Sequence, residues 1–119
     1  MQVEKVEIFT TLIWKSKLPN FDSIKQKVLS SLENVRLEDG EGVHRSNFNG
    51  YRSKDIKHLQ ELSPLFHHVM DVMVRKAIQD CNINVRSAAI SESWCLFNDT
   101  ANAFNQPHVH RALFSGKLS

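Results

Sequence analysis

The sequence has few of the residues that mark specialised classes of protein. Its two cysteines, Cys81 and Cys95, form no Cys-x-x-Cys pair, so we expect no disulfide framework and a reducing, cytoplasmic setting. No apolar run approaches the roughly 20 residues that a membrane helix needs. The N-terminus carries Glu4 and Glu7 where a signal peptide has its apolar core. The sequence therefore predicts neither a membrane span nor a leader.

The sequence also lacks an excess of charge of either sign. Its 15 basic and 13 acidic residues give a formal net charge of +2. The basic residues are scattered, with no run that would follow a phosphate backbone, so nucleic acid is not an expected partner. Hydrophobic residues make up 41% of the 119 residues, which is ordinary for a globular protein. The length predicts one domain over residues 1–119.

Hydrophobic periodicity predicts two helices. The first is capped by Asn20 or Asp22 and runs to about Asn34. The second begins at Ser63-Pro64, with proline in its first turn, and ends near Cys81-Asn82. Its expected buried face consists of Leu65, Phe66, Val69, Val72, Met73 and Ile78.

Three segments rich in β-branched and aromatic residues predict strands, at residues 6–14, 85–97 and 108–114. Residues 35–53 hold three of the four glycines and predict a long loop, which is often functional in a compact domain. The fold class is therefore α+β. Its last strand would present an unpaired edge, suited to self-association or to pairing with a second polypeptide.

His108-Val109-His110 is the pattern that most directly indicates chemistry. Side chains two residues apart on a strand project from the same face, so the two imidazoles can share one metal ion such as Fe(II), Zn(II), Cu(II) or Ni(II). Asn105 and Gln106 precede the pair and are candidates to hydrogen-bond its rings. The other histidines, His44, His58, His67 and His68, have no partner at ligand spacing and are expected at the surface.

Three blocks of sequence resemble a family of 2-oxoglutarate/Fe(II)-dependent oxygenases. Residues 94–116 are similar to the family's strand beginning with Trp, its N-x-x-H-x-H segment and its S-G. Residues 46–53, S-N-F-N-G-Y-R-S, resemble its S-N-x-x-G-W-H-S loop. Residues 9–14, F-T-T-L-I-W, are similar to its N-terminal F-x-T-P-I-W strand. The blocks occur in the family's order and spacing.

The resemblance implies an N-terminal strand and helices that lead into a partial double-stranded β-helix, or jelly roll. It also implies Fe(II) and 2-oxoglutarate as cofactors, with oxidative decarboxylation to succinate and CO2 coupled to attack on a substrate C–H bond. By position, His108 and His110 are the first metal ligands. The residues expected to support the ligands or to form a substrate loop are Asn105, Ser46, Asn47, Gly50, Tyr51 and Trp94.

The sequence departs from the family after Ser115-Gly116. The strands that carry the last histidine ligand and the basic partner of 2-oxoglutarate have no counterpart among the 119 residues. Arg111 replaces the proline that follows H-x-H, and Tyr51-Arg52 replaces Trp-His in the loop. We therefore expect an incomplete or inactive form of the oxygenase, which a second polypeptide would complete.

Two other functions fit the same residues. A remnant of the fold could serve as a non-catalytic interaction module that uses its strand edge. A cupin-like metal binder would also combine H-x-H with a jelly roll, although the sequence has no glycine between Gly50 and Gly116 to match the usual cupin spacing. The identity of the substrate, whether small molecule or protein, is not encoded in any of these patterns.

Overall fold

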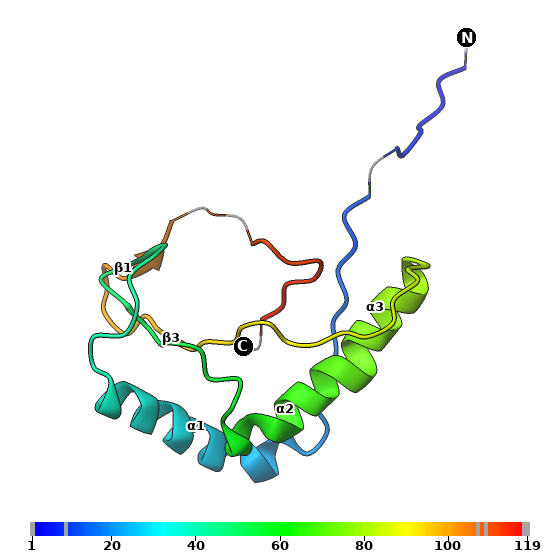
Figure 1. The fold of residues 1–119 in the computed structure, drawn as a ribbon. Coiled ribbons are helices and arrows are strands. Elements are labelled where there is room, and N and C mark those ends of the chain that lie inside the picture. The colour runs from blue at the N-terminus through cyan, green and yellow to red at the C-terminus, as the bar shows by residue number, and fades with distance from the viewer. Residues whose placement is uncertain (1, 9, 107, 109, 118–119) are drawn as a thin grey trace.

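The computed structural model of the chain describes residues 2–8, 10–106, 108 and 110–117. Two helical segments and two short antiparallel strand pairs make up its regular structure (Figure 1). The closed barrel of a complete jelly roll is not present in this part of the chain, and the predicted partial jelly roll stays a prediction.

Helix α1 spans Phe21–Glu38 and begins where the sequence predicts. Asn20 precedes it in the left-handed conformation with φ of 56°, and its side chain makes no capping hydrogen bond. The Ser23 hydroxyl instead donates to the Asn20 carbonyl at 2.6 Å. The helix continues four residues past the predicted end at Asn34, because Val35 still packs against the core.

The second helical segment runs without interruption from residue 60 to residue 80. It consists of the 3₁₀ turn η1 at Gln60–Leu62, α2 at Ser63–His68, the π-helical η2 at Val69–Val74 and α3 at Arg75–Asp80. Pro64 lies in the first turn of α2, as predicted, and the segment ends before Cys81, also as predicted. No helix among the described residues is long and apolar enough to cross a bilayer.

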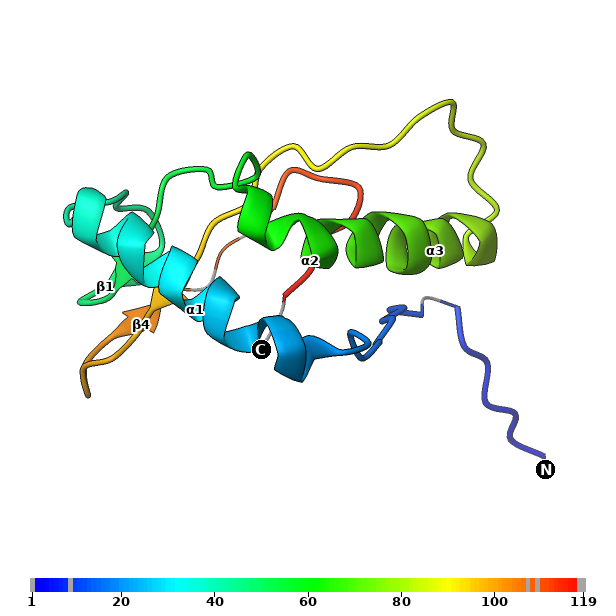
Figure 2. The same cartoon turned by 90° about the horizontal axis from the view of Figure 1, so that it is seen from below.

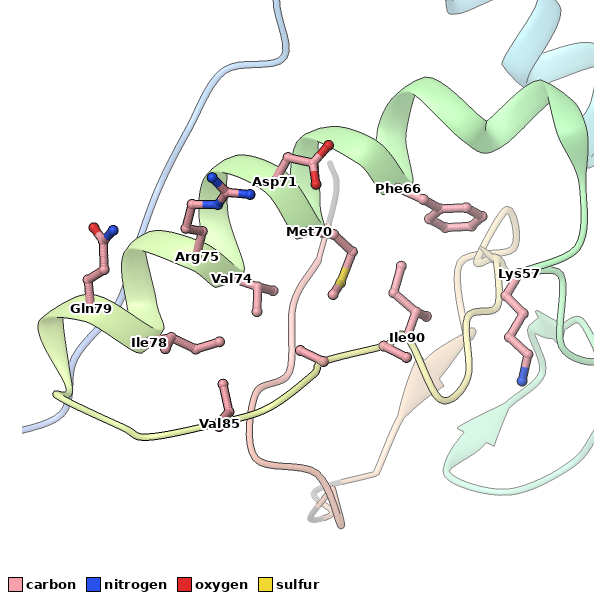
Figure 3. A pocket seen from close by; sticks show the side chains of 12 residues that line it. Lys57, Phe66, Met70, Asp71, Val74, Arg75, Ile78, Gln79, Val85 and Ile90 are labelled. Carbon is pink, nitrogen blue, oxygen red and sulfur yellow. The ribbon is translucent and has the colours of Figure 1, made fainter.

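The predicted buried face of this segment is partly wrong. Val69 and Val72 are exposed. Phe66 and Ile78, which were predicted, form the apolar face together with Met70 and Val74, which were not. These four residues are spaced four apart and line a groove of about 680 Å³ beside the extended segment 85–90 (Figure 3).

The strands pair two segments that are distant in sequence. β1 (Asn47–Phe48) pairs antiparallel with β4 (Phe104–Asn105), and β2 (Tyr51–Arg52) pairs antiparallel with β3 (Leu96–Phe97). Hydrogen bonds extend the pairing at both ends, from Gln106 N to Ser46 O and from Ile56 N to Ser93 O. Residues 46–56 therefore run antiparallel to residues 93–106, with residues 98–103 looped out between the two strand pairs.

The longer predicted strands are corrected by the structure. The described residues of 6–14 form no strand and are mostly exposed, and residues 2–8 project away from the rest of the chain (Figures 1 and 2). Of 85–97 only Leu96–Phe97 is a strand, and the described residues of 108–114 form none. Strand propensity is realised only where a neighbouring strand supplies hydrogen bonds. Residues 93–97 have such a neighbour in residues 51–56, whereas the described residues of 6–14, 85–92 and 108–114 are paired with no strand.

The hydrophobic core joins α1 to the start of the second helical segment, where α1 contacts η1. Val28, Ile56 and Leu62 are its buried centre. Partly buried residues surround it: Ile24, Leu32, Val35, Leu59, Leu65, Phe66 and Cys95. The core is small for 119 residues, so each of its members carries a large share of the stability.

Replacing Leu62 by alanine should lower the free energy of unfolding by about 2–5 kcal/mol, because the change leaves a cavity in this core. Urea denaturation followed by far-UV circular dichroism measures the change. Leu37→Ala is the matched control, since Leu37 is 81% exposed and its loss should change the free energy by no more than about 0.5 kcal/mol. Equal effects of the two substitutions would contradict this placement of the core.

Candidate functional site

The pairing of residues 46–56 with residues 93–106 brings two of the three family-like blocks into contact. Residues 46–53 form one side of the pairing, and residues 94–106 form most of the other. In the third block, Thr10 to Ile13 are exposed. Trp14 donates its indole N–H to Asp80 at 2.9 Å, and its ring packs edge-to-face against that of Phe114, in the 94–116 block, with a centroid separation of 6.0 Å.

The two histidines of the H-x-H pattern lie side by side. The ring centroids of His108 and His110 are 4.8 Å apart, in an edge-to-face arrangement. The indole of Trp94 is the next ring along, with its centroid 5.8 Å from that of His110. Three of the predicted site residues therefore form one cluster, and its histidines are exposed to solvent.

A backbone contact determines the tautomer of His108. Its Nδ1 lies 2.7 Å from the carbonyl oxygen of Gln106. Because a carbonyl oxygen only accepts hydrogen bonds, Nδ1 carries the proton in this contact, and Nε2 keeps the lone pair that a metal ion needs. Gln106, one of the two residues predicted to hydrogen-bond the histidine rings, thus contacts His108 through its main-chain carbonyl.

Arg52 is a member of the cluster that the sequence did not identify. Its guanidinium carbon lies 4.1 Å from the centroid of the Trp94 ring, within cation–π distance. The side chain is only 7% exposed, and its one ion pair, to Glu92, is long at 3.5 Å. Burial, followed by repulsion from Arg45, lowers the pKa of Arg52, while Glu92 opposes the shift. A single arginine in a polar loop gives no sequence signal of such stacking.

Several predicted loop residues have structural roles. Asn47 is buried; its Oδ1 accepts from the Arg45 N–H at 2.9 Å, and its Nδ2 donates to the Gly50 carbonyl at 3.3 Å. These bonds shape the turn between β1 and β2. Gly50 packs closely against the Asn98 side chain, where a Cβ would collide with Asn98 Oδ1. Neither residue contacts the histidine cluster.

Tyr51 also points to the body of the fold. Its hydroxyl donates to the Asp39 carbonyl at 2.7 Å, just past the end of α1. Its ring packs against Phe97 with a centroid separation of 6.0 Å. Burial, followed by the charge of Asp39, raises the pKa of Tyr51. Tyr51 therefore anchors the strand pairing to α1.

Ser46 and Asn105 fix the register at the other end of the pairing. The Ser46 carbonyl accepts from the Gln106 N–H at 2.6 Å, and Asn105 lies opposite Asn47. Because Gln106 is still hydrogen-bonded to Ser46, the chain leaves the strand pairing only two residues before His108. The predicted support of the metal ligands by the Asn105 side chain stays a prediction.

Ser53 is the most deeply buried polar residue of the pairing, at 1% exposure. Its hydroxyl accepts from the Cys95 N–H at 3.0 Å and donates to the Lys54 carbonyl at 2.7 Å. Cys95 packs against the hydrophobic core, and burial raises the pKa of its thiol. Ser53 thus joins the strand pairing to the core directly beside Trp94.

The remaining histidines do not join this cluster. Within the described ranges, no three His, Cys, Asp or Glu side chains come together in an arrangement that could hold a metal ion. His44, His58 and His67 are exposed, as predicted. His68 is half-buried, and its Nε2 lies 2.8 Å from the Ser16 hydroxyl. The groove beside the second helical segment is a separate feature, because none of its lining residues is a predicted site residue.

Replacing Ser53 by alanine should lower the free energy of unfolding by about 1–3 kcal/mol, because the buried Cys95 N–H would lose its acceptor. Chemical denaturation measures this loss. Ser87→Ala is the control, since Ser87 is exposed. If both variants unfold at the wild-type urea concentration, the Ser53 hydroxyl does not stabilise the pairing.

Comparison of the chain with protein-family models, with curated proteins and with solved structures found no match.

Proposed function

We propose that the chain is the metal-holding part of a 2-oxoglutarate/Fe(II)-dependent oxygenase of the jelly-roll type. The observation that carries the proposal is the contact between the His108 and His110 rings, 4.8 Å apart and next to Trp94. The family-like order of the sequence blocks supports it independently. The unpaired state of both cysteines agrees with the cytoplasmic location that forms part of the proposal.

The residues fit one half of such a metal site. His108 and His110 would hold the ion, with the Gln106 carbonyl keeping the His108 Nδ1 protonated. Bound iron and 2-oxoglutarate would supply the oxidation of a substrate C–H bond. A third His, Cys, Asp or Glu ligand does not lie beside the pair within the described residues, so a complete iron site does not fit here.

The surroundings of the pair have defined roles in the proposal. Trp94 lies against His110 and limits the rotation of its imidazole. Arg52, stacked on Trp94, restrains the indole in turn. An aromatic ring beside a bound metal ion would exclude water from one side of it, which would strengthen electrostatic interactions with a bound anion.

A non-catalytic interaction module is the second candidate. The specific observation in its favour is the exposure of large apolar side chains along the N-terminal segment, with Val3 at 94%, Ile8 at 77% and Ile13 at 79%. Exposed apolar residues gathered in one segment are typical of a surface that binds another protein.

The first prediction from the proposal concerns metal affinity. His108→Ala and His110→Ala should each weaken Ni(II) or Zn(II) binding in calorimetric titrations. The loss should be at least about 10- to 100-fold, the range found when even an outer partner of a metal ligand is removed. His67→Ala, an exposed histidine outside the cluster, should bind like wild type. Equal affinity of all four proteins would refute a metal site at this pair.

The second prediction concerns turnover. The purified 119-residue chain, supplied with Fe(II), ascorbate and 2-oxoglutarate, should form no succinate above the protein-free blank, because two histidines give a weak iron site. A known oxygenase in the same assay is the positive control. Succinate formation that disappears in His108→Ala would show that the chain provides the missing groups itself.

A further inference from the structure

The pair of His108 and His110 is suited to bind a metal ion together with ligands from a second molecule. Both side chains are exposed, and Nε2 of His108 is available because Nδ1 is occupied by the Gln106 carbonyl. Two imidazoles leave at least two positions open on an ion that prefers four ligands, as Zn(II) does. Within the described residues no third His, Cys, Asp or Glu ligand is near, so those positions are open to water or to ligands from a second molecule.

The chain also exposes far more surface than a compact monomer. Its accessible surface is 10182 Å², against about 6,600 Å² expected for a folded monomer of its 13.7 kDa mass. Its radius of gyration is 17.7 Å, against about 13.5 Å for a compact domain of this length. The difference in area exceeds the roughly 1,600 Å² that a stable interface buries.

We propose that two copies of this chain associate and hold one Zn(II) ion between their His108–His110 pairs. A two-fold axis presents the same two donors from each copy, and this gives the four neutral imidazoles of a tetrahedral site. The proposal shares the histidine pair with the proposed function but needs neither iron nor 2-oxoglutarate.

The four imidazoles of such a site determine which metal ions it prefers. Four imidazoles with no carboxylate favour Zn(II), Cu(II) or Ni(II) over Fe(II), following the usual affinity order. A second copy also provides a partner for the exposed apolar side chains of Val3, Val6, Ile8, Leu12 and Ile13. The formal net charge of +2 per chain opposes association only weakly, because salt screens exposed charges.

Sedimentation velocity of the full 119-residue chain tests this proposal. The expected result is a monomer in EDTA and a dimer after addition of half an equivalent of ZnSO4, with one zinc per two chains in the isolated dimer. The apparent dissociation constant of the dimer should rise at least about tenfold in His108→Ala and in His110→Ala. His67→Ala is the control and should dimerise like wild type.

Three outcomes overturn the proposal and are distinguishable from one another. A dimer that persists in EDTA and in both variants would show association through apolar surface alone. One zinc per monomeric chain, lost in the variants, would remove the bridging site but leave the metal pair of the proposed function. No zinc binding at all would remove both. Far-UV circular dichroism of the variants shows whether they fold, and since both histidines are exposed we expect unchanged spectra.

Discussion

The antiparallel pairing of residues 46–56 with residues 93–106 is the contact on which the rest of the candidate site depends. It sets Arg52 against Trp94 and directs the chain after β4 into His108 and His110. Its hydrogen bonds join residues that are between 37 (Ile56 and Ser93) and 60 (Ser46 and Gln106) positions apart in sequence, so closing it costs loop entropy that the local contacts have to offset. The Ser53 hydroxyl and the packing of Cys95 against the core provide part of that stabilisation. An ion pair of 2.7 Å between Arg36 and Asp99 connects the loop at residues 98–103 to α1.

The second constraint is the shortage of buried apolar area. In the part of the chain that the structure describes, five hydrophobic residues are buried: Val28, Tyr51, Ile56, Leu62 and Ala77. The core therefore stabilises the junction of α1, η1 and the strand pairing. The N-terminal segment and the groove side of the second helical segment are less buried. A protein with this distribution gains stability from anything that binds the folded state, including a metal ion or a second copy. The metal site proposed at the exposed histidine pair would provide such coupling.

The helices were predictable because their signals are local. Pro64 marks the start of α2, and apolar periodicity fixes the extent of both helical segments to within a few residues. The strands were not predictable, because their formation depends on partners that are distant in sequence. Residues 6–14, for example, have the composition of a strand but no paired neighbour among the described residues. The proximity of His108 and His110 was predicted from strand geometry, but the described residues of 108–114 form no strand, so the two rings lie together without the strand on which the prediction rested. The stacking of Arg52 on Trp94 could not be predicted from the sequence. It results from the register of the strand pairing, and the sequence contains no signal for that register.

The central claim is that the strand pairing places a metal-binding histidine pair beside Trp94. Paramagnetic broadening by Cu(II) in NMR spectra of the 119-residue chain tests it most directly. Substoichiometric Cu(II) should broaden the ring signals of His108, His110 and Trp94 first, while the ring signals of His58 and His67 keep their line widths. Broadening centred on another histidine, or broadening of His108 and His110 that leaves the Trp94 indole unchanged, would contradict the claim.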